Sequence, residues 1–115
     1  YLNNYGNHTR DFTYINDINK ILLNLLKRNI PKGNNIFNIC SNNPIKITKV
    51  LELISNEIKI KPQIFKRKFQ KADVKKTHGS NKKIKKFTKI NKFTNVDYAI
   101  TSTAKWYKKN WKIFN

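Results

Sequence analysis

The sequence has no methionine, one cysteine, three glycines and only six acidic residues among its 115 residues. Without an initiator methionine, the chain is interpreted as a piece of a longer protein. Cys40 has no second cysteine for an internal disulfide and no ligand partner at metal-site spacing, so we expect a small buried apolar residue. No apolar run approaches the roughly 20 residues of a membrane helix, and nothing in the sequence resembles a secretory leader. A soluble, cytoplasmic protein with no membrane partner is expected.

The shortage of glycine and of acidic residues also limits the chemistry. Gly6, Gly33 and Gly79 lie far apart, so they form neither a dinucleotide fingerprint nor a phosphate-binding loop, and no cofactor site or metal site is expected. A pair of catalytic carboxylates would require distant segments to converge. His8 and His78 lie in polar segments without a nucleophile beside them, so we expect both to be exposed bystanders. No catalytic residue is predicted.

What the chain has in excess is positive charge, with 25 Lys and Arg residues and a formal net charge of +19. Such a surface attracts polyanions, and a small basic nucleic-acid-binding module is the alternative interpretation, using the lysine-rich residues 66–92 and the interleaved Phe69, Phe87 and Phe93. The excess is nearly all lysine, interleaved with asparagine and isoleucine, which share adenine- and thymine-rich codons. Base composition can therefore generate this charge without a nucleic-acid partner, and it is the favoured explanation.

Hydrophobic periodicity predicts alternating strands and helices in the first half of the chain. Residues 10–14 alternate with period two, as in a short strand, and an amphipathic helix follows from an Asn16 cap to near Lys27. The apolar residues 36–40 suit a buried strand, and a second amphipathic helix covers residues 47–58. The pattern is typical of an α/β fold.

The second half is predicted to hold a surface loop and two more helices. Residues 69–79 lack apolar periodicity and form the loop. Ser80 is predicted to cap a short helix that buries Ile84 and Phe87, and Thr94 has capping-box spacing to Asp97 at the head of the last helix. That last helix is expected to bury Val96, Ala99, Ile100, Thr103 and Tyr107. No repeat or flexible linker divides residues 1–115, so one unit is expected.

Residues 10–18, RDFTYINDI, resemble the RDFxYxxDI segment of nucleotide-sugar epimerases and dehydratases. Further similarity follows in order: FNI at 37–39 resembles the family's YNI strand, QKADV at 70–74 its QPGDV loop, and AKWY at 104–107 its closing VEWY helix. The chain thus resembles the carboxy-terminal part of the NAD-dependent epimerase/dehydratase family of extended short-chain dehydrogenases. Among its subfamilies it is most like UDP-glucuronate 4-epimerase.

This resemblance implies a small α/β substrate-binding segment, with short strands and about four helices, from which the Rossmann half is missing. In the family, that amino-terminal half holds NAD and a Tyr-x-x-x-Lys pair, which this sequence lacks. Catalysis of a UDP-sugar reaction, for synthesis of polysaccharide precursors, would then belong to sequence upstream of Tyr1. The fragment alone is predicted to be inactive, and the parent enzyme is expected to be a homodimer.

The resemblance also implies the binding residues. Arg10 matches an arginine that contacts the diphosphate, and Asp73 matches an aspartate that accepts hydrogen bonds from ribose hydroxyls. Phe12 and Gln70 match positions that line the nucleotide site, and Thr77 falls on a motif threonine. Three alternatives stay open: an Arg10 ion pair with the adjacent carboxylate, a purely turn-forming Asp73 and a core-packing Phe12.

Three positions depart from the family, which has glycine where this chain has Cys40, Ala72 and Lys89. A side chain in the left-handed backbone region costs on the order of 1 kcal/mol. If Ala72 and Lys89 need that conformation, each of them strains the fold.

Overall fold

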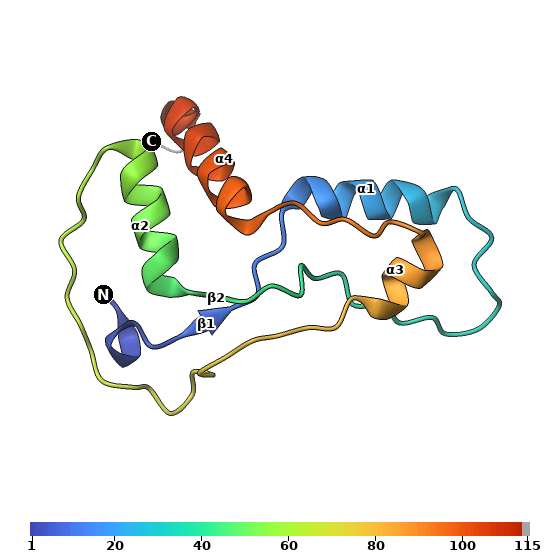
Figure 1. The fold of residues 1–115 in the computed structure, drawn as a ribbon, viewed down its shortest axis with the longest axis horizontal. Coiled ribbons are helices and arrows are strands. Elements are labelled where there is room, and N and C mark those ends of the chain that lie inside the picture. Colours follow the sequence, from blue (N-terminus) through green and yellow to red (C-terminus); the bar gives the residue numbers. More distant parts are fainter. Residues whose placement is uncertain (114–115) are drawn as a thin grey trace.

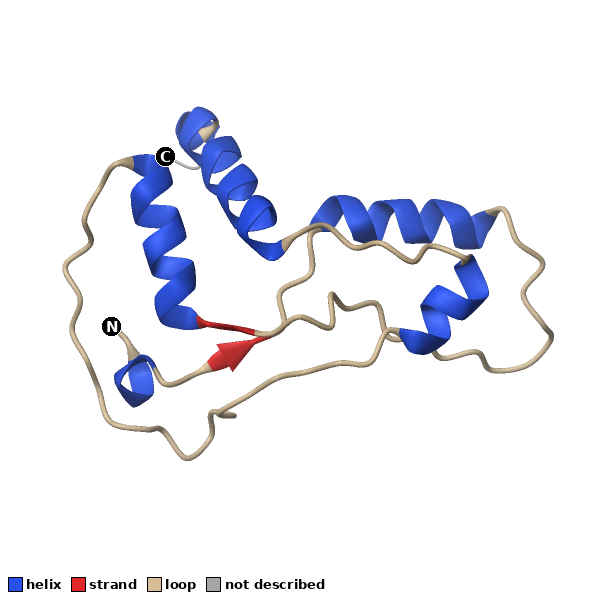
Figure 2. Ribbon diagram, in the orientation of Figure 1, coloured by secondary structure: helices blue, strands red, loops and turns tan. Residues whose placement is uncertain are grey.

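The computed structural model describes residues 1–113, and it is an elongated α/β arrangement measuring 51 × 36 × 25 Å. Helices α2 and α4 pack together at one end, α1 and α3 pack at the other, and the short strands lie between them (Figures 1 and 2). The elements are a 3₁₀ turn at Asn3–Gly6, β1 at Thr9–Arg10, α1 at Ile15–Leu26, β2 at Ile45–Lys46, α2 at Ile47–Ile58, α3 at Lys82–Thr88, α4 at Val96–Lys109 and a second 3₁₀ turn at Trp111–Ile113.

Strand β1 is flanked on both sides, which fixes its position. It pairs with β2 in antiparallel register, Thr9 opposite Lys46 and Arg10 opposite Ile45. On its other side, the Thr9 N–H donates to the Lys75 carbonyl at 3.0 Å, and the Thr9 carbonyl accepts from the Thr77 N–H at 3.1 Å. The loop of residues 69–79 is therefore held beside β1.

Both predicted amphipathic helices are confirmed, the strand predicted at 10–14 is found only in part, and the strand predicted at 36–40 is wrong. The apolar side chains of α1 and α2 recur at helical spacing, although only Ile21 of α1 is fully buried and the stripe of α2 is half-buried, and α1 ends at Leu26 as expected. The strand predicted at 10–14 stops at Arg10, because the next N–H, that of Asp11, donates to the Thr77 hydroxyl and the chain then enters α1. Tyr14, and not Asn16, occupies the N-cap position of α1.

The apolar residues 36–40 form no strand, because no strand runs beside them within residues 1–113. Two of their carbonyl groups instead accept hydrogen bonds from side chains. Lys83 Nζ donates to the Ile36 carbonyl at 2.8 Å, and Asn81 Nδ2 donates to the Cys40 carbonyl at 2.9 Å. Side-chain donors thus replace the backbone ladder that a strand would have formed.

The caps of the last two helices also differ from prediction. Asn81, which is buried, occupies the N-cap position of α3 in place of Ser80. At the head of α4, the side chain of Asn95 accepts from the backbone of Asp97 and Tyr98, so the predicted Thr94–Asp97 capping box is absent. Thr94 instead donates twice to Asp17 of α1, through its N–H at 2.8 Å and its hydroxyl at 2.9 Å. This pair of bonds ties the two ends of the molecule together.

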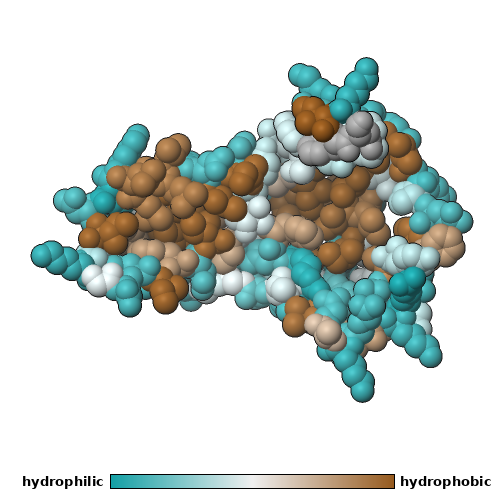
Figure 3. Space-filling view, turned by 180° about the vertical axis from the view of Figure 1, so that it is seen from behind, coloured by the Kyte–Doolittle hydropathy of each residue, from teal (hydrophilic) through white to brown (hydrophobic). Residues whose placement is uncertain are grey.

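The apolar core is small and lies mainly along α4. Among the expected core residues, Val96, Ala99, Ile100 and Ile84 are buried, and Phe87 is half-buried. Thr103 and Tyr107 are exposed, and Ala104 takes the buried position on that face of α4. Many large apolar side chains remain on the surface, where they gather in two areas (Figure 3). The small buried apolar core therefore contacts few of the loops, and other interactions must hold them in position.

Polar contacts of Asp11 join three segments that are remote in the sequence. Its Oδ1 accepts from the Ser41 hydroxyl at 2.5 Å, and its Oδ2 accepts from the Gly79 N–H at 3.1 Å. Burial raises the pKa of this carboxyl group, but the hydrogen bonds from Ser41, Gly79 and Asn43 outweigh burial and lower its pKa below the ordinary value. The charged form of Asp11 therefore stabilises the junction.

Gly79 is required at this junction by space, since an added Cβ would lie 2.6 Å from Cys40 Sγ. Cys40 is half-buried, as a small apolar residue, and burial followed by the nearby Asp11 charge raises the pKa of its thiol. Backbone strain was expected at Ala72 and Lys89, where the family has glycine, and it is found at one of these two positions. Lys89 ends α3 with φ at 62°, whereas Ala72 is outside the left-handed region.

We predict that Asp11→Asn lowers the free energy of unfolding by about 1–3 kcal/mol at pH 7, because an uncharged amide has one acceptor oxygen where the carboxylate accepts through two, from Ser41 and Gly79. Because the pKa of Asp11 is lower in the folded state than in the unfolded chain, its charged form stabilises the fold at pH values above the ordinary carboxyl pKa. This stabilisation is lost as the pH falls through the pKa of the folded state. Urea unfolding should therefore show a difference between wild type and variant that shrinks below about pH 4. Asp97→Asn, an exposed control, should change stability by less than about 1 kcal/mol. Equal losses in both variants would contradict the role of Asp11.

We also predict that Gly79→Ala destabilises the fold by about 1–3 kcal/mol through its clash with Cys40 Sγ. Cys40→Ala removes the sulfur, so the double variant should recover part of that loss in a double-mutant cycle measured by urea unfolding. Strictly additive losses would show that the thiol is not the obstacle.

Candidate functional site

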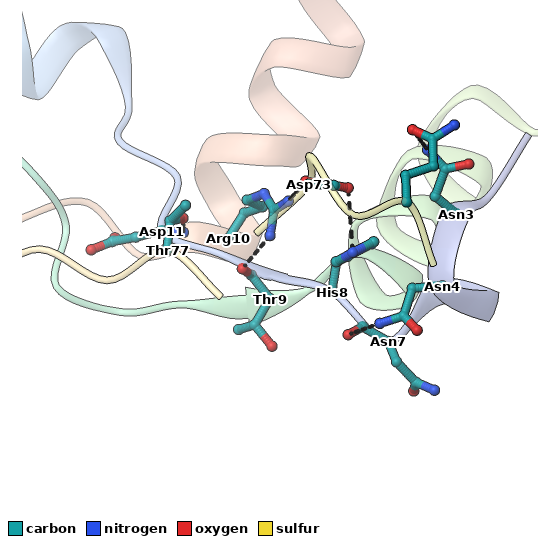
Figure 4. Close-up of polar contacts among 10 residues, drawn as sticks. Asn3, Asn4, Asn7, His8, Thr9, Arg10, Asp11, Asp73 and Thr77 are labelled. Atoms are coloured by element: carbon teal, nitrogen blue, oxygen red, sulfur yellow. Dashed lines mark hydrogen bonds and ion pairs between the residues drawn. The ribbon is translucent and has the colours of Figure 1, made fainter. Parts of the chain in front are cut away.

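Arg10 and Asp73, which are 63 residues apart in the sequence, meet in an ion pair beside β1. Arg10 Nη2 donates to Asp73 Oδ1 at 2.6 Å, and Arg10 Nη1 donates to the Thr9 carbonyl at 3.0 Å (Figure 4). The side chains of Arg10 and Asp73 are 23% and 30% exposed, so both remain accessible to a ligand. The alternative ion pair of Arg10 with Asp11 is not formed, because the Asp11 carboxylate is bound to Ser41 and Gly79.

The backbone of the 69–79 loop explains this meeting. Thr9 is hydrogen bonded to both Lys75 and Thr77, which brings the loop alongside β1. The Asp73 N–H donates to the Gln70 carbonyl at 3.0 Å, so Asp73 closes a turn while its carboxylate faces Arg10. The turn-forming role and a ligand-binding role are therefore compatible at this residue.

Two other expected site residues lie in this loop, but the structure gives each of them a partner within the chain. Gln70 is exposed, and its Oε1 accepts from Asn3 Nδ2 at 3.2 Å. The Thr77 hydroxyl accepts from the Asp11 N–H at 3.0 Å, where it extends the contact between the loop and β1 (Figure 4). Thr77 thereby fixes the backbone of Asp11, which directly follows Arg10.

Phe12 is not brought together with Arg10 and Asp73. It lines an apolar groove of about 980 Å³ between α2 and α4, and neither Arg10 nor Asp73 contributes to that lining. The groove's apolar walls include Val50, Ile54, Ile100, Ala104 and Tyr107. With 36% of its surface exposed, Phe12 is neither fully packed in the core nor beside the ion pair.

His8 belongs to this site, and the expectation that it is an exposed bystander is wrong. It is 5% exposed, and its Nε2 lies 3.3 Å from Asp73 Oδ2, although the pair lacks hydrogen-bond geometry. Its ring lies 6.1 Å from that of Phe69, centroid to centroid. The sequence contained a signal for this, because side chains two residues apart, such as those of residues 8 and 10, lie on the same side of an extended chain. His78, in contrast, is exposed and contacts Asn42.

The basic surface does not present a shared stacking platform for nucleic-acid bases. Phe69 lies beside His8, whereas Phe87 packs against Phe37 at a centroid distance of 5.0 Å. The three phenylalanines of the alternative interpretation also lie under cations of the chain itself: Lys75 over Phe69, Arg28 over Phe87 and Lys85 over Phe93. Each of these rings therefore already has a cation of this chain over one face.

The glycines of the described residues do not form a dinucleotide-binding turn. Gly6, Gly33 and Gly79 lie on three separate segments, and within residues 1–113 no glycine-rich turn joins a strand to a helix. No cluster of three or more histidine, cysteine, aspartate or glutamate side chains in that range could hold a metal ion. No described helix is long and apolar enough to cross a membrane. We therefore assign no hydride-transfer step to this chain.

Comparison with known sequences identifies partial relatives, although no family model matches. The chain is 34% identical over 106 residues to UDP-glucuronate 4-epimerase from Thermodesulfobacterium geofontis, an alignment that covers 91% of this chain and 32% of that enzyme. It is 30% identical over 110 residues to an uncharacterised protein of Methanocaldococcus jannaschii, covering 93% of this chain and 32% of the relative. The chain thus spans about a third of the length of these relatives.

Comparison with solved structures places the fold in the same group. MoeE5, solved with UDP-glucuronic acid and NAD, superposes with a TM-score of 0.81 at 16% identity, covering 94% of this chain and 36% of MoeE5. UDP-glucuronic acid 4-epimerase from Bacillus cereus gives a TM-score of 0.78 at 17% identity, over 90% of this chain and 33% of the enzyme. UDP-glucose 4-epimerase from Thermotoga maritima gives 0.76 at 20% identity, over 92% and 33%.

Four helices and two short strands in this order match about a third of such enzymes, as the motif order predicts. The chain is accordingly a partial homologue of UDP-glucuronate 4-epimerase, its fold matches about a third of solved NAD-dependent epimerases and dehydratases, and it fits their carboxy-terminal part.

Proposed function

We propose that this chain is the substrate-holding part of an NAD-dependent UDP-sugar epimerase or dehydratase, in which it binds the nucleoside diphosphate of the substrate. The observation that carries the proposal is the pairing of Arg10 with Asp73 at 2.6 Å, in a position where both side chains remain accessible. A planar guanidinium group binds phosphate oxygens through two parallel hydrogen bonds. A carboxylate accepts hydrogen bonds from hydroxyl groups.

A nucleoside diphosphate offers both of these chemical groups on one molecule. Its diphosphate competes with Asp73 for Arg10, and its ribose hydroxyls donate to the carboxylate that Arg10 leaves. The ligand thereby exchanges one ion pair within the chain for two contacts with the protein, so neither Arg10 nor Asp73 is left buried without a partner. Gln70, which opens the same turn, is placed to add a contact when its bond to Asn3 is released.

In this proposal the reaction itself depends on a second structural part that supplies NAD and the catalytic base. MoeE5 and the Bacillus cereus epimerase carry UDP-glucuronic acid together with NAD, and each is about three times as long as the matched region. The similarity to UDP-glucuronate 4-epimerase favours UDP-glucuronate as the substrate and inversion at sugar carbon four as the reaction. The product would then serve as a precursor for polysaccharide synthesis.

Nucleotide binding tests the site directly. Isothermal titration calorimetry with the 115-residue chain should detect UDP-glucuronate, and Arg10→Ala should weaken its affinity by at least about tenfold because a charge-assisted contact is worth about 1.5–3 kcal/mol. Arg67→Ala is the matched control, since it removes the same charge at an exposed position over the Tyr1 ring. Equal losses in the two variants would contradict a specific role for Arg10.

Salt dependence separates this function from nucleic-acid binding. Binding to a single-stranded oligonucleotide should weaken steeply between about 50 and 200 mM salt, because each neutralised phosphate releases counterions. A preference for UDP-glucuronate over inorganic pyrophosphate should persist over that range if the ribose is recognised. Loss of that preference, together with strong oligonucleotide binding at 200 mM, would favour the basic module instead.

The enzymatic part of the proposal is tested with a chimera in which this chain replaces the matching carboxy-terminal third of the Thermodesulfobacterium geofontis epimerase. We expect the chimera to interconvert UDP-glucuronate and its carbon-four epimer in a coupled chromatographic assay, and the chain alone to show no turnover. Arg10→Ala in the chimera should lower kcat/KM by at least about tenfold. A soluble, folded chimera that binds NAD but has no activity would contradict the assignment.

A further inference from the structure

His8 is a buried ionisable residue for which the nucleotide-binding proposal has no use so far. Its side chain is 6% exposed, and its Nε2 has no hydrogen-bond partner even though it faces Asp73 at 3.3 Å. A buried polar atom without a partner normally costs about 1–3 kcal/mol, so its presence calls for a reason. Figure 4 shows the imidazole and the guanidinium of Arg10 approaching the same carboxylate.

The two oxygens of Asp73 are divided between these two side chains. Oδ1 accepts from Arg10 Nη2, and Oδ2 is the atom nearest His8 Nε2. A bare nitrogen lone pair would repel the carboxylate oxygen, so we assign a hydrogen to Nε2. In the protonated imidazole that hydrogen belongs to a cation, and the contact becomes a second ion pair to one carboxylate.

The charged groups around His8 are otherwise positive. Arg10 lies two residues further along the chain, Lys75 of the loop lies over the Phe69 ring, and Lys46 of β2 is paired with the neighbouring Thr9. Asp73 is the one negative group among these neighbours. While Arg10 remains on Asp73, the carboxylate is already neutralised, and protonation of His8 brings little additional attraction.

We propose that His8 is a positioning residue of the nucleotide site that, in its protonated form, replaces Arg10 as the counter-ion of Asp73 when the diphosphate takes Arg10. The inference rests on the proposed function, because it requires a ligand that competes for Arg10. The proton comes from solvent and goes to the imidazole, which becomes fully charged next to the carboxylate. Asp73 stays ionised, close to the loop position at which it accepts from the ribose.

This exchange couples binding to proton uptake with a defined sign. Binding removes a positive charge from Asp73 and so favours protonated His8, which means that affinity is higher at acidic pH. Imidazole side chains in general change charge between about pH 5 and 8, so the dependence is to be measured across that range.

The coupling is tested first without nucleotide. Proton NMR should follow the two imidazole resonances of the 115-residue chain between about pH 5 and 8, with His8 and His78 assigned by the His78→Gln variant. Arg10→Ala should move the His8 titration midpoint to higher pH, since it removes the competing cation, and Asp73→Asn should move it to lower pH. Both replaced side chains are partly exposed, so their removal leaves the buried ring in place. Unchanged midpoints in both variants would overturn the inference.

The second measurement is calorimetric binding of UDP-glucose, whose diphosphate is esterified at both ends and whose sugar is uncharged, so the ligand does not titrate near neutrality. Affinity should rise about fivefold to tenfold from pH 7.5 to 5.5, with proton uptake seen by comparing two buffers of different ionisation enthalpy. His8→Gln should bind with an affinity that is nearly independent of pH, and His78→Gln should behave as wild type, because His78 is exposed and is hydrogen bonded to the exposed Asn42 side chain.

The outcomes separate the two proposals. Binding that is independent of pH in the wild type, or that keeps its pH dependence in His8→Gln, overturns the role of His8 and leaves the nucleotide site intact. Shifted His8 midpoints without any binding of UDP-glucose support the coupling of His8 to Asp73 and contradict the proposed function.

Discussion

The contacts of the Asp11 carboxylate hold the rest of the structure in place. They join the end of β1 to Ser41 and Gly79, which come from segments 30 and 68 residues away. Thr77, two residues before Gly79, adds a bond to the Asp11 N–H. The bond to Gly79 fastens the end of the 69–79 loop, whose backbone bonds to Thr9 bring Asp73 to Arg10. The same hydrogen bonds lower the pKa of the Asp11 carboxyl group, so it stays charged at this junction.

The helices could be predicted from the sequence because each carries its apolar stripe within a dozen residues. The strands could not, since a strand is defined by a partner that local periodicity does not identify. Residues 36–40 have the composition of a buried strand, yet Asn81 and Lys83, more than 40 residues later, satisfy their carbonyl groups. The capping error at α4 has a similar origin, because Thr94 finds a distant carboxylate, Asp17, in place of a local partner.

For the candidate site, too, local sequence motifs predicted some residues, and contacts with distant segments decided the others. The RDF and QKADV motifs identified Arg10 and Asp73, and the structure brings these two together. Motif position alone did not place Phe12, which lines the groove between α2 and α4. His8 was missed because its surrounding sequence is polar, and it is buried only when the distant loop with Phe69 and Asp73 folds over it. Burial of a single polar residue is thus a tertiary property.

A small core and a large polar network together decide how this site should respond to change. Seven apolar side chains are buried within residues 1–113, so packing fixes the helices in pairs but does not reach the loop that carries Asp73. That loop is held by backbone bonds to Thr9 and by side chains that ionise or donate hydrogen bonds. Changes in charge at Asp11, Arg10 or Asp73 should therefore move the site more than volume changes in the core do. A ligand that exchanges one ion pair for another can for the same reason reorganise this loop without unfolding either helix pair.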